Sequence, residues 1–572
     1  MPRVVVFMDR QHRSSLVLLL LILAFVCVNG VACVGGDLDD PPGALVVELT
    51  ADSVDGLAAL EVNFTAEITG GEEPFAYGWD YGDDSTASGS SDTTHLFRRA
   101  GEYQVTLTVT DDLGNSELAT VEISVRWCDL PEDVPDEFVA TYEELCGSLA
   151  EFEAGIDEQW DGTQSEQGVK FAAQTSMANG GAGPWLLASW RWERLLAELD
   201  SFQKMGVDTV KIEGMYPIVT PAFHEYVAAN PDVIADELID YYRAYPDEFR
   251  CSIEPYECAA QDFLDFYTDV GDEIRSRDMD IVLGHANMFP AASDSSVNPQ
   301  GYYDEMKADD PKARFLDERT AELHSYIEAL SLGQDDHITV LEEPDLNNAN
   351  FGVLLDGGLL YEEAEWVAYV EAVASDVRGE FDGRLGAGMG TWSDGYFVEP
   401  FAESETLDYI DFHVYQMITR TDEDELIHGY QNLVDWIDTV RAIDPSKQVT
   451  VGESWLYKVG PDEQAALDAD YVQVFSRDVY SFWEPLDQRW LEVFYKVAHH
   501  AELSVWLPYW TTYFFSYLDY DDPTVTALRE AEDYRGLSEY ASQSTSGVAE
   551  AYVAGDGGLT GTGDRYCDIM AR

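Results

Sequence analysis

The sequence predicts a multidomain protein, in which an immunoglobulin-like β-sandwich precedes an α/β domain of the (β/α)8 TIM-barrel class. Residues 44–126 hold short alternating strand patterns separated by Gly, Asp, Ser and Thr, as an all-β sandwich does. From residue 169 onward strand-like and helix-like segments alternate, which indicates a parallel sheet covered by helices. The 572 residues also exceed the length of one ordinary domain.

The first 33 residues have the pattern of an export signal. Three arginines precede an uncharged run, residues 16–28, that is short for a membrane span, and small residues follow it. Cys33 and the acidic tether 34–43 are similar to a lipoprotein acceptor, although Gly30 stands where leucine is usual. Plain cleavage and a retained anchor are the alternatives. We expect an extracellular protein, secreted or anchored at the cell surface, that meets a membrane only through such an anchor.

The composition is strongly acidic throughout. The chain has 110 acidic and 32 basic residues, a net charge of −78 and a pI near 4.1. Such a field repels nucleic acid, so we expect no nucleic-acid partner. Adaptation to high salt is one hypothesis for this charge, and an ordinary soluble acidic exterior is the other. We expect a monomer.

The cysteines predict one disulfide. In an oxidising compartment Cys251 and Cys258 are close enough in sequence to close a small loop. Cys128, Cys146 and Cys567 cannot all pair with one another. Because no CxxC pair or HxH cluster accompanies them, a zinc site is not indicated. We expect no organic cofactor, and any metal would be structural calcium.

The sandwich segment resembles a known family. Its motifs are Trp-Asp-Tyr-Gly-Asp-Asp at 79–84, His-Leu-Phe at 95–97, and the run 100–111. Together they resemble the polycystic-kidney-disease (PKD) domain, with Tyr81 and Asp84 where that family usually has Phe and Gly. Trp79 would fill the core between the sheets. The resemblance implies a spacer or a weak binding module outside the cell.

The remaining segments complete the predicted barrel. Residues 127–168 form an acidic connector with helix-like patches, to which we assign no chemistry. The barrel is expected over 169–572, with a rim insertion at about 220–272. Its eight predicted strands are 169–174, 207–215, 279–283, 338–343, 385–389, 409–415, 449–453 and 503–507.

Polar and aromatic residues stand at the ends of these strands, where a barrel carries its active groups. They are Lys211, Glu213 and Tyr216; His285 and Asn287; Glu342 and Glu343; His413 and Tyr415; Glu453; and Trp506 with Trp510. Aromatic faces stack on sugar rings, while carboxylates and imidazoles bond hydroxyls, so carbohydrate is the indicated ligand class.

The order of these groups resembles glycoside hydrolase clan A, the retaining (β/α)8 glycosidases. That clan typically has Asn-Glu-Pro ending strand four, His-x-Tyr on strand six, a glutamate ending strand seven and a tryptophan on strand eight. The resemblance therefore implies Glu343 as acid/base and Glu453 as nucleophile. It also implies substrate contacts for His413 and Tyr415, and Trp506 as a sugar platform, with Trp510 beyond it.

Two positions depart from the clan pattern. Glu342 stands where the clan has the asparagine that bonds the sugar 2-hydroxyl, and strand two has Lys211 where many members have arginine. We expect both Glu342 and Lys211 to contact substrate. His285 is open between a substrate contact and a hydrogen bond at the rim. We expect an endo-acting hydrolase of β-linked polysaccharide. A non-catalytic carbohydrate-binding surface protein and a barrel hydrolase acting on another substrate class are the alternatives.

Overall fold

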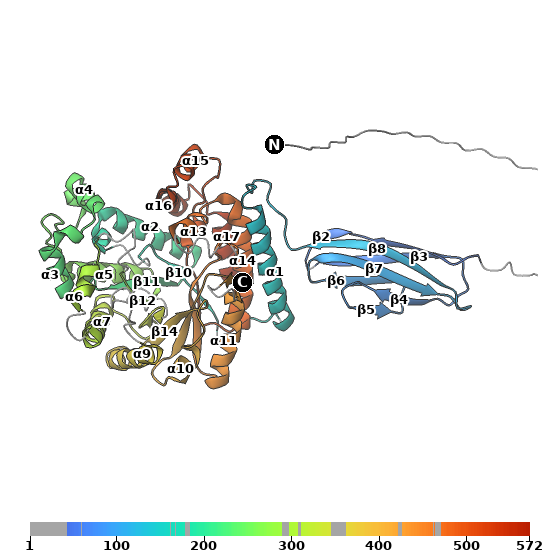
Figure 1. Ribbon diagram of the computed structural model, residues 1–572, viewed down its shortest axis with the longest axis horizontal. Helices are drawn as coiled ribbons and strands as arrows, with labels where there is room; N and C mark the ends of the chain where they lie inside the picture. Colours follow the sequence, from blue (N-terminus) through green and yellow to red (C-terminus); the bar gives the residue numbers. More distant parts are fainter. Residues whose placement is uncertain are drawn as a thin grey trace, which may run out of the picture. The chain divides into compact units, whose positions relative to one another are not determined.

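The computed structural model describes residues 43–572 apart from 59, 161, 166–167, 178–182, 289–296, 307–310, 345–361, 421–425, 462 and 464–470. The predicted export signal, and all of the acidic tether but its last residue, lie outside the described residues. The chain divides into two compact units, with most of the sandwich strands in the first and the barrel in the second (Figure 1).

The N-terminal unit is the predicted β-sandwich. Its strands are β1 (Val46–Ala51), β2 (Asp55–Leu57), β3 (Leu60–Thr69), β4 (Ala76–Asp80), β5 (Thr86–Ser88), β6 (Asp92–Phe97), β7 (Gly101–Thr110) and β8 (Ser116–Arg126). They form one sheet in the order β1-β3-β6 and another in the order β2-β8-β7-β4-β5. Trp79 is buried with Phe64 and Leu107, as the alternating pattern predicts.

Helix α1 (Val139–Gln159) belongs to the second unit by its packing. Tyr142, Leu145 and Leu149 repeat at helical spacing and are buried in the core that the barrel helices share. The helix packs against α14 (Glu484–His500), where the Arg489 guanidinium lies 2.9 Å from the Glu153 carboxylate. The 127–168 segment, to which the sequence analysis assigns no chemistry, thus supplies a layer of the barrel unit.

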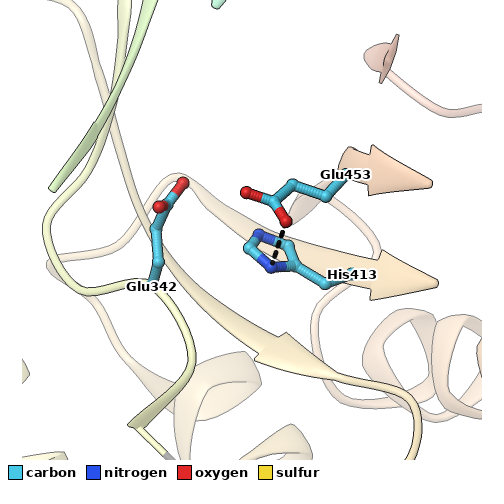
Figure 2. A group of neighbouring side chains, drawn as sticks. All are labelled: Glu342, His413 and Glu453. Carbon is cyan, nitrogen blue, oxygen red and sulfur yellow. Dashed lines mark ion pairs between the residues drawn. The ribbon is translucent and has the colours of Figure 1, made fainter. Parts of the chain in front are cut away.

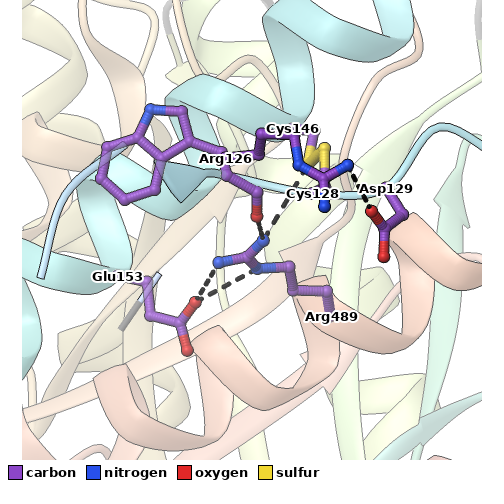
Figure 3. Close-up of a disulfide and its surroundings, with 7 residues drawn as sticks. Arg126, Cys128, Asp129, Cys146, Glu153 and Arg489 are labelled. Carbon is purple, nitrogen blue, oxygen red and sulfur yellow. Dashed lines mark hydrogen bonds and ion pairs between the residues drawn. A yellow bond between two sulfur atoms is a disulfide. The ribbon is translucent and has the colours of Figure 1, made fainter. Parts of the chain in front are cut away.

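A disulfide secures the chain just before α1. It joins Cys128 to Cys146, which lies about two turns into the helix (Figure 3). Arg489 also bonds the carbonyl oxygen of Trp127, so α14 holds both sides of this bridge. A second disulfide joins Cys251 to Cys258, on the loop that precedes α5 (Ala260–Ser276).

The second unit is a closed parallel barrel. Its strand segments are β9 (Lys170–Phe171), β10 (Ala173–Gln174), β11 (Thr209–Tyr216), β12 (Asp280–Asn287), β13 (His337–Thr339), β14 (Arg384–Gly390), β15 (Tyr409–Val414), β18 (Gln448–Ser454) and β19 (Val505–Pro508). They run in the order β10-β11-β12-β13-β14-β15-β18-β19-β9. Only Ala172 separates β9 from β10, so these two pieces form one strand. That strand pairs with β11 on one side and β19 on the other, which closes the ring at the eight predicted positions.

Helices cover the outside of the barrel. The longer ones after α1 are α2 (Ser189–Met205), α5, α7 (Pro311–Ala329), α9 (Glu363–Val377), α11 (Gly429–Ile443), α14 and α16 (Tyr534–Ala554). The shorter ones are α3 (Pro221–Ala229), α4 (Asp236–Ala244), α6 (Gln300–Met306), α10 (Val398–Glu403), α13 (Tyr471–Ser476), α15 (Pro523–Glu530) and α17 (Gly561–Met570).

The apolar stripe of α2 shows why these helices bind the sheet. Leu195, Leu199 and Phe202 repeat at helical spacing and are buried, and Gly206 ends the helix in a left-handed conformation (φ 95°). Helices α3 and α4 fall within the predicted insertion, and α5 is the crossover helix before β12. Among the described helices, none combines the length and apolar character that crossing a membrane requires.

Candidate active site

Charged side chains on or just after four strands converge inside the barrel. They are Lys211 and Glu213 on β11, Glu342 and Glu343 after β13, Asp411 and His413 on β15, and Glu453 on β18. Figure 2 shows Glu342, His413 and Glu453 pointing toward one another from their three segments. Strands β15 and β18 are adjacent in the sheet, and β13 is separated from β15 only by β14. Because these strands are parallel, they end at the same rim of the barrel.

Glu453 is held on both of its oxygens. The Tyr415 hydroxyl donates to Oε2 at 2.5 Å, and the Lys211 ammonium lies 2.7 Å from Oε1. His413 Nδ1 lies 3.4 Å from Oε2. Burial alone raises the pKa of Glu453, but the charges of His413 and Lys211 and these hydrogen bonds outweigh it and hold the pKa below its ordinary value. The arrangement favours an ionised, fixed carboxylate.

His413 links the two predicted catalytic glutamates. Its Nδ1 lies 2.7 Å from Glu343 Oε1, and its Nε2 lies 3.6 Å from Asp411 Oδ2. Burial lowers the pKa of this imidazole, but the surrounding negative charges of Glu453 and Glu343 outweigh burial and raise it well above the ordinary value. These charges favour the protonated form of the ring.

Glu343 and Glu453 lie on either side of one ring atom. Because both lie against Nδ1 of His413, at 2.7 and 3.4 Å, their nearest oxygens are at most about 6 Å apart, which allows the about 5–5.5 Å separation of retaining glycosidases. Glu343 adopts a left-handed backbone (φ 46°). Its side chain is 17% exposed against 8% for Glu453, so Glu343 is the carboxylate more open to solvent.

Asp411 supports the site from within the strands, and the sequence analysis missed it. Its Oδ1 accepts hydrogen bonds from the Thr450 hydroxyl at 2.5 Å and from the Gly452 backbone amide at 2.7 Å. A Cβ at Gly452 would overlap this carboxylate, which explains glycine just before Glu453. The alternation of β15 was the available signal, because Asp411 shares a strand face with His413.

Lys211 lies between two carboxylates. It is fully buried, with Nζ 2.6 Å from Glu342 Oε1 and 2.7 Å from Glu453 Oε1. Glu342 is 5% exposed and lies over Gly284, where a Cβ would overlap its carboxylate. Lys211, predicted to contact substrate, thus meets protein carboxylates instead.

The aromatic wall differs from the predicted one. Trp506 is completely buried and stacks on Phe494 of α14 at 5.9 Å, and its Nε1 donates to Ser454 Oγ. The prediction of a sugar platform at Trp506 is therefore wrong, because its ring faces the helices. Tyr509, three residues later, lies edge-on to Tyr415 at 5.8 Å between ring centres.

Half-buried Trp510 lies beside Tyr509, with ring centres 4.9 Å apart. Tyr457 stacks on Tyr415, also at 4.9 Å. The residues that follow β18 and β19 thus supply the aromatic surface next to Glu453.

His285 also lies away from the site. Its Nε2 is 3.4 Å from Glu322 Oε2 of α7, and its ring lies edge-on to Tyr326 of the same helix. Asn287 accepts a hydrogen bond from Arg319, again on α7. Of the two alternatives for His285, the structure favours a hydrogen bond over a substrate contact, because this face of β12 is covered by α7.

Glu342, His413 and Glu453 have the side-chain types of a metal site, and their nearest ligand atoms lie within 4.8 Å of one another. The two carboxylates already share the Lys211 ammonium. This donor set therefore does not fit a metal ion.

Comparison with known proteins identifies the sandwich. Residues 44–125 match the family model of the PKD domain, so this segment is a PKD domain. Among solved structures, the PKD1 domain of the Vibrio cholerae metalloprotease PrtV is 30% identical over 14% of this chain and 96% of that one, with a TM-score of 0.13.

Longer matches are more distant. A family 39 glycoside hydrolase from the gut symbiont Bacteroides cellulosilyticus WH2 is 11% identical over 81% of this chain and 75% of that one, with a TM-score of 0.30. The exo-β-1,4-mannosidase Op5Man5 from Opitutaceae bacterium strain TAV5 is 12% identical over 68% and 62%, with a TM-score of 0.38. The chemistry of the barrel therefore rests on its own residues.

Proposed function

We propose that this protein is a retaining glycoside hydrolase with Glu343 as acid/base and Glu453 as nucleophile. One observation carries the proposal: two carboxylates, Glu343 and Glu453, lie against the same His413 ring, and Lys211 and Tyr415 favour the ionised form of Glu453. Retaining glycosidases need a pair at this separation, with one ionised carboxylate and one proton donor.

The pair performs two displacements. Glu453 attacks the anomeric carbon while Glu343 protonates the departing glycosidic oxygen, which breaks the carbon–oxygen bond and leaves a glycosyl ester on Glu453. Water then attacks the same carbon, Glu343 takes the proton of that water, and the ester bond breaks to release the sugar with its original anomeric configuration.

The substrate is a β-linked polysaccharide or oligosaccharide outside the cell. Tyr509 and Trp510 supply aromatic surface beside the carboxylates, a combination that suits the apolar faces and hydroxyl edges of sugar rings. The acidic chain and the PKD domain are consistent with an extracellular location. Endo action is the accompanying proposal, since aromatic residues follow more than one strand.

The test is hydrolysis of β-glycans (galactan, mannan, xylan, mixed-linkage glucan and cellulose) at low and at multimolar salt. Replacing Glu343 or Glu453 by Ala should each lower kcat by at least about 10³-fold, whereas the exposed Glu403→Ala should leave it unchanged. Proton NMR of the first-formed anomer reports retention. Activity that survives Glu453→Ala, or an inverted product, would place the chemistry elsewhere.

A non-catalytic carbohydrate-binding role is the second candidate. The third carboxylate, Glu342, favours it, because it competes with Glu453 for the same ammonium. This candidate expects glycan binding by calorimetry with no cleavage of any glycan in the panel.

A further inference from the structure

Lys211 is placed to act on Glu453, the proposed nucleophile. Its side chain is fully buried near the start of β11, and its ammonium lies within 2.7 Å of one oxygen from Glu342 and one from Glu453. An ammonium group has three N–H donors. Burying it costs little energy only where nearby negative charges balance its positive charge. Lys211 thus connects Glu342 and Glu453, which lie on different segments.

The charges that face Lys211 come from every side of the barrel. Glu213 lies 4.0 Å away on the same strand, the charge of Asp411 acts on it from β15, and the Tyr509 ring lies 5.9 Å away after β19. Glu342 and Glu453 bring the carboxyl groups around Lys211 to four; burial raises the pKa of Glu213 and Glu342, whereas nearby positive charges hold the pKa of Glu453 below its ordinary value. A change in one carboxylate must therefore alter how strongly the ammonium holds the other.

Neighbouring strands hold Glu342 in place beside Lys211. Its carboxylate lies against Gly284 on β12 and its Cα against Gly388 on β14, so two neighbouring strands hold it over Lys211. Its 5% exposure leaves little surface for a substrate hydroxyl. The predicted substrate contact at Glu342 is thus less consistent with the structure than a contact to Lys211.

We infer that Lys211 is a positioning residue whose one ammonium is shared between Glu342 and the nucleophile Glu453, so that Glu342 weakens the hold on Glu453 and thereby tunes its reactivity. This inference rests on the proposed function. Lys211 keeps Glu453 ionised and oriented toward the anomeric carbon. Glu342 interacts with the same ammonium and so weakens its attraction to Glu453. The two side chains act as one unit.

The test is a double-mutant cycle of Lys211→Met, Glu342→Gln and the double variant, read by kcat/KM across pH and by thermal unfolding. Lys211→Met leaves two buried carboxylates without their cation and should lower kcat by about 10²–10³-fold while moving the acidic limb to higher pH. In the double variant one of those carboxylates is neutral, so activity should recover about tenfold over Lys211→Met.

Glu342→Gln alone gives an independent test, which remains available if Lys211→Met does not fold. Lys211 then pairs with Glu453 alone and a nearby like charge is gone, so the acidic limb should move to lower pH. The inference would be overturned if the acidic limb stayed in place. It would also be overturned if the fold-change in kcat/KM of the double variant equalled the product of the fold-changes of the two single variants.

Lys447→Met is the matched control. Lys447 is also buried, but its ammonium donates to the carbonyl oxygens of Ser404 and Leu407 at the other end of β18. Its loss should lower the unfolding temperature without moving the acidic limb. If the parent protein cleaves no glycan, the proposed function fails, and the unfolding cycle still measures whether Lys211 and Glu342 are coupled.

Discussion

Tyr415 is the residue on which the ionised state of Glu453 can be tested with the smallest change. Its hydroxyl donates to Glu453 Oε2 at 2.5 Å, and its ring is wedged between Tyr457 and Tyr509. Tyr415→Phe keeps the ring and removes the donor. Because that hydrogen bond lowers the pKa of Glu453, we expect the acidic limb of kcat/KM to move to higher pH and kcat to fall about 10–100-fold.

The matched control for that substitution is Tyr396→Phe, which removes a hydroxyl from an exposed tyrosine. An unchanged pH profile in Tyr415→Phe, with the fold intact by circular dichroism, would contradict the assignment of Glu453 as the ionised partner.

Substitutions at Trp506 and Tyr509 test which of the two aromatic residues is structural and which contacts sugar. Trp506→Phe removes buried contacts and the hydrogen bond to Ser454, so it should cost about 1–3 kcal/mol of unfolding free energy and leave KM unchanged. Tyr509→Ala removes aromatic surface beside Glu453, so KM should rise about tenfold. Denaturant unfolding and initial rates give the two readouts. The opposite pattern would restore Trp506 as the platform.

The predicted site residues differ in the strand face they occupy, and this decides which of them point into the barrel. Glu453 and His413 stand at predicted strand ends and point inward. His285 also stands at a predicted strand end, but it alternates in step with Ile281 and Leu283, which are buried outside the barrel. That alternation was visible in the sequence, whereas the ion pairs of Lys211 depend on neighbouring strands and were not.

At the scale of elements, α7 carries a buried glutamate whose titration should be measurable. Glu322 Oε1 accepts hydrogen bonds from the Thr220 hydroxyl and the Val219 amide, which holds the loop after β11 against the helix. Burial raises its pKa from 4.5 to about 8. The folded state therefore holds this proton more tightly than the unfolded state does.

This difference makes the protein less stable as pH rises. The contribution of the protonated Glu322 is fully present below pH 4.5 and is lost as pH rises through about 8. Glu322→Gln mimics the protonated form, so its unfolding free energy should decline less over that interval than that of the parent. Urea unfolding at several pH values measures it, with the exposed Glu328→Gln on the same helix as control. Parallel pH dependences for parent and Glu322→Gln would show that Glu322 does not titrate in this interval.

The barrel strands were predictable as elements, and α1 was only partly so. Each of the eight predicted strand positions has a parallel strand, because apolar runs bounded by polar residues identify buried parallel strands well. The helix-like patch at 138–152 corresponds to α1, but the sequence does not show that it packs on α14, more than 300 residues later. The pairing of Cys128 with Cys146 likewise needed the folded chain.

At the scale of the whole molecule, the excess of 110 acidic over 32 basic residues dominates the electrostatics. Inside the barrel, the positive charge of Lys211 balances the buried carboxylates of Glu342 and Glu453. The remaining negative charge repels itself more in the compact state than in the expanded unfolded chain. Hydrophobic burial in the two units has to offset this repulsion.

Added salt should therefore stabilise this protein. Ions screen repulsion between exposed carboxylates, while the buried ion pairs around Lys211 are screened much less. From low to multimolar sodium chloride we expect Tm to rise on the order of 5–10 °C, with the pH profile of the site nearly unchanged. Calorimetry measures Tm in salt and in an uncharged osmolyte at equal osmolality. The osmolyte reproduces exclusion of solute from the protein surface without screening its charges, so the comparison distinguishes the two effects. A Tm that is flat or falls with salt would show that the surface charge does not limit stability, and the hypothesis of adaptation to high salt would lose its physical basis.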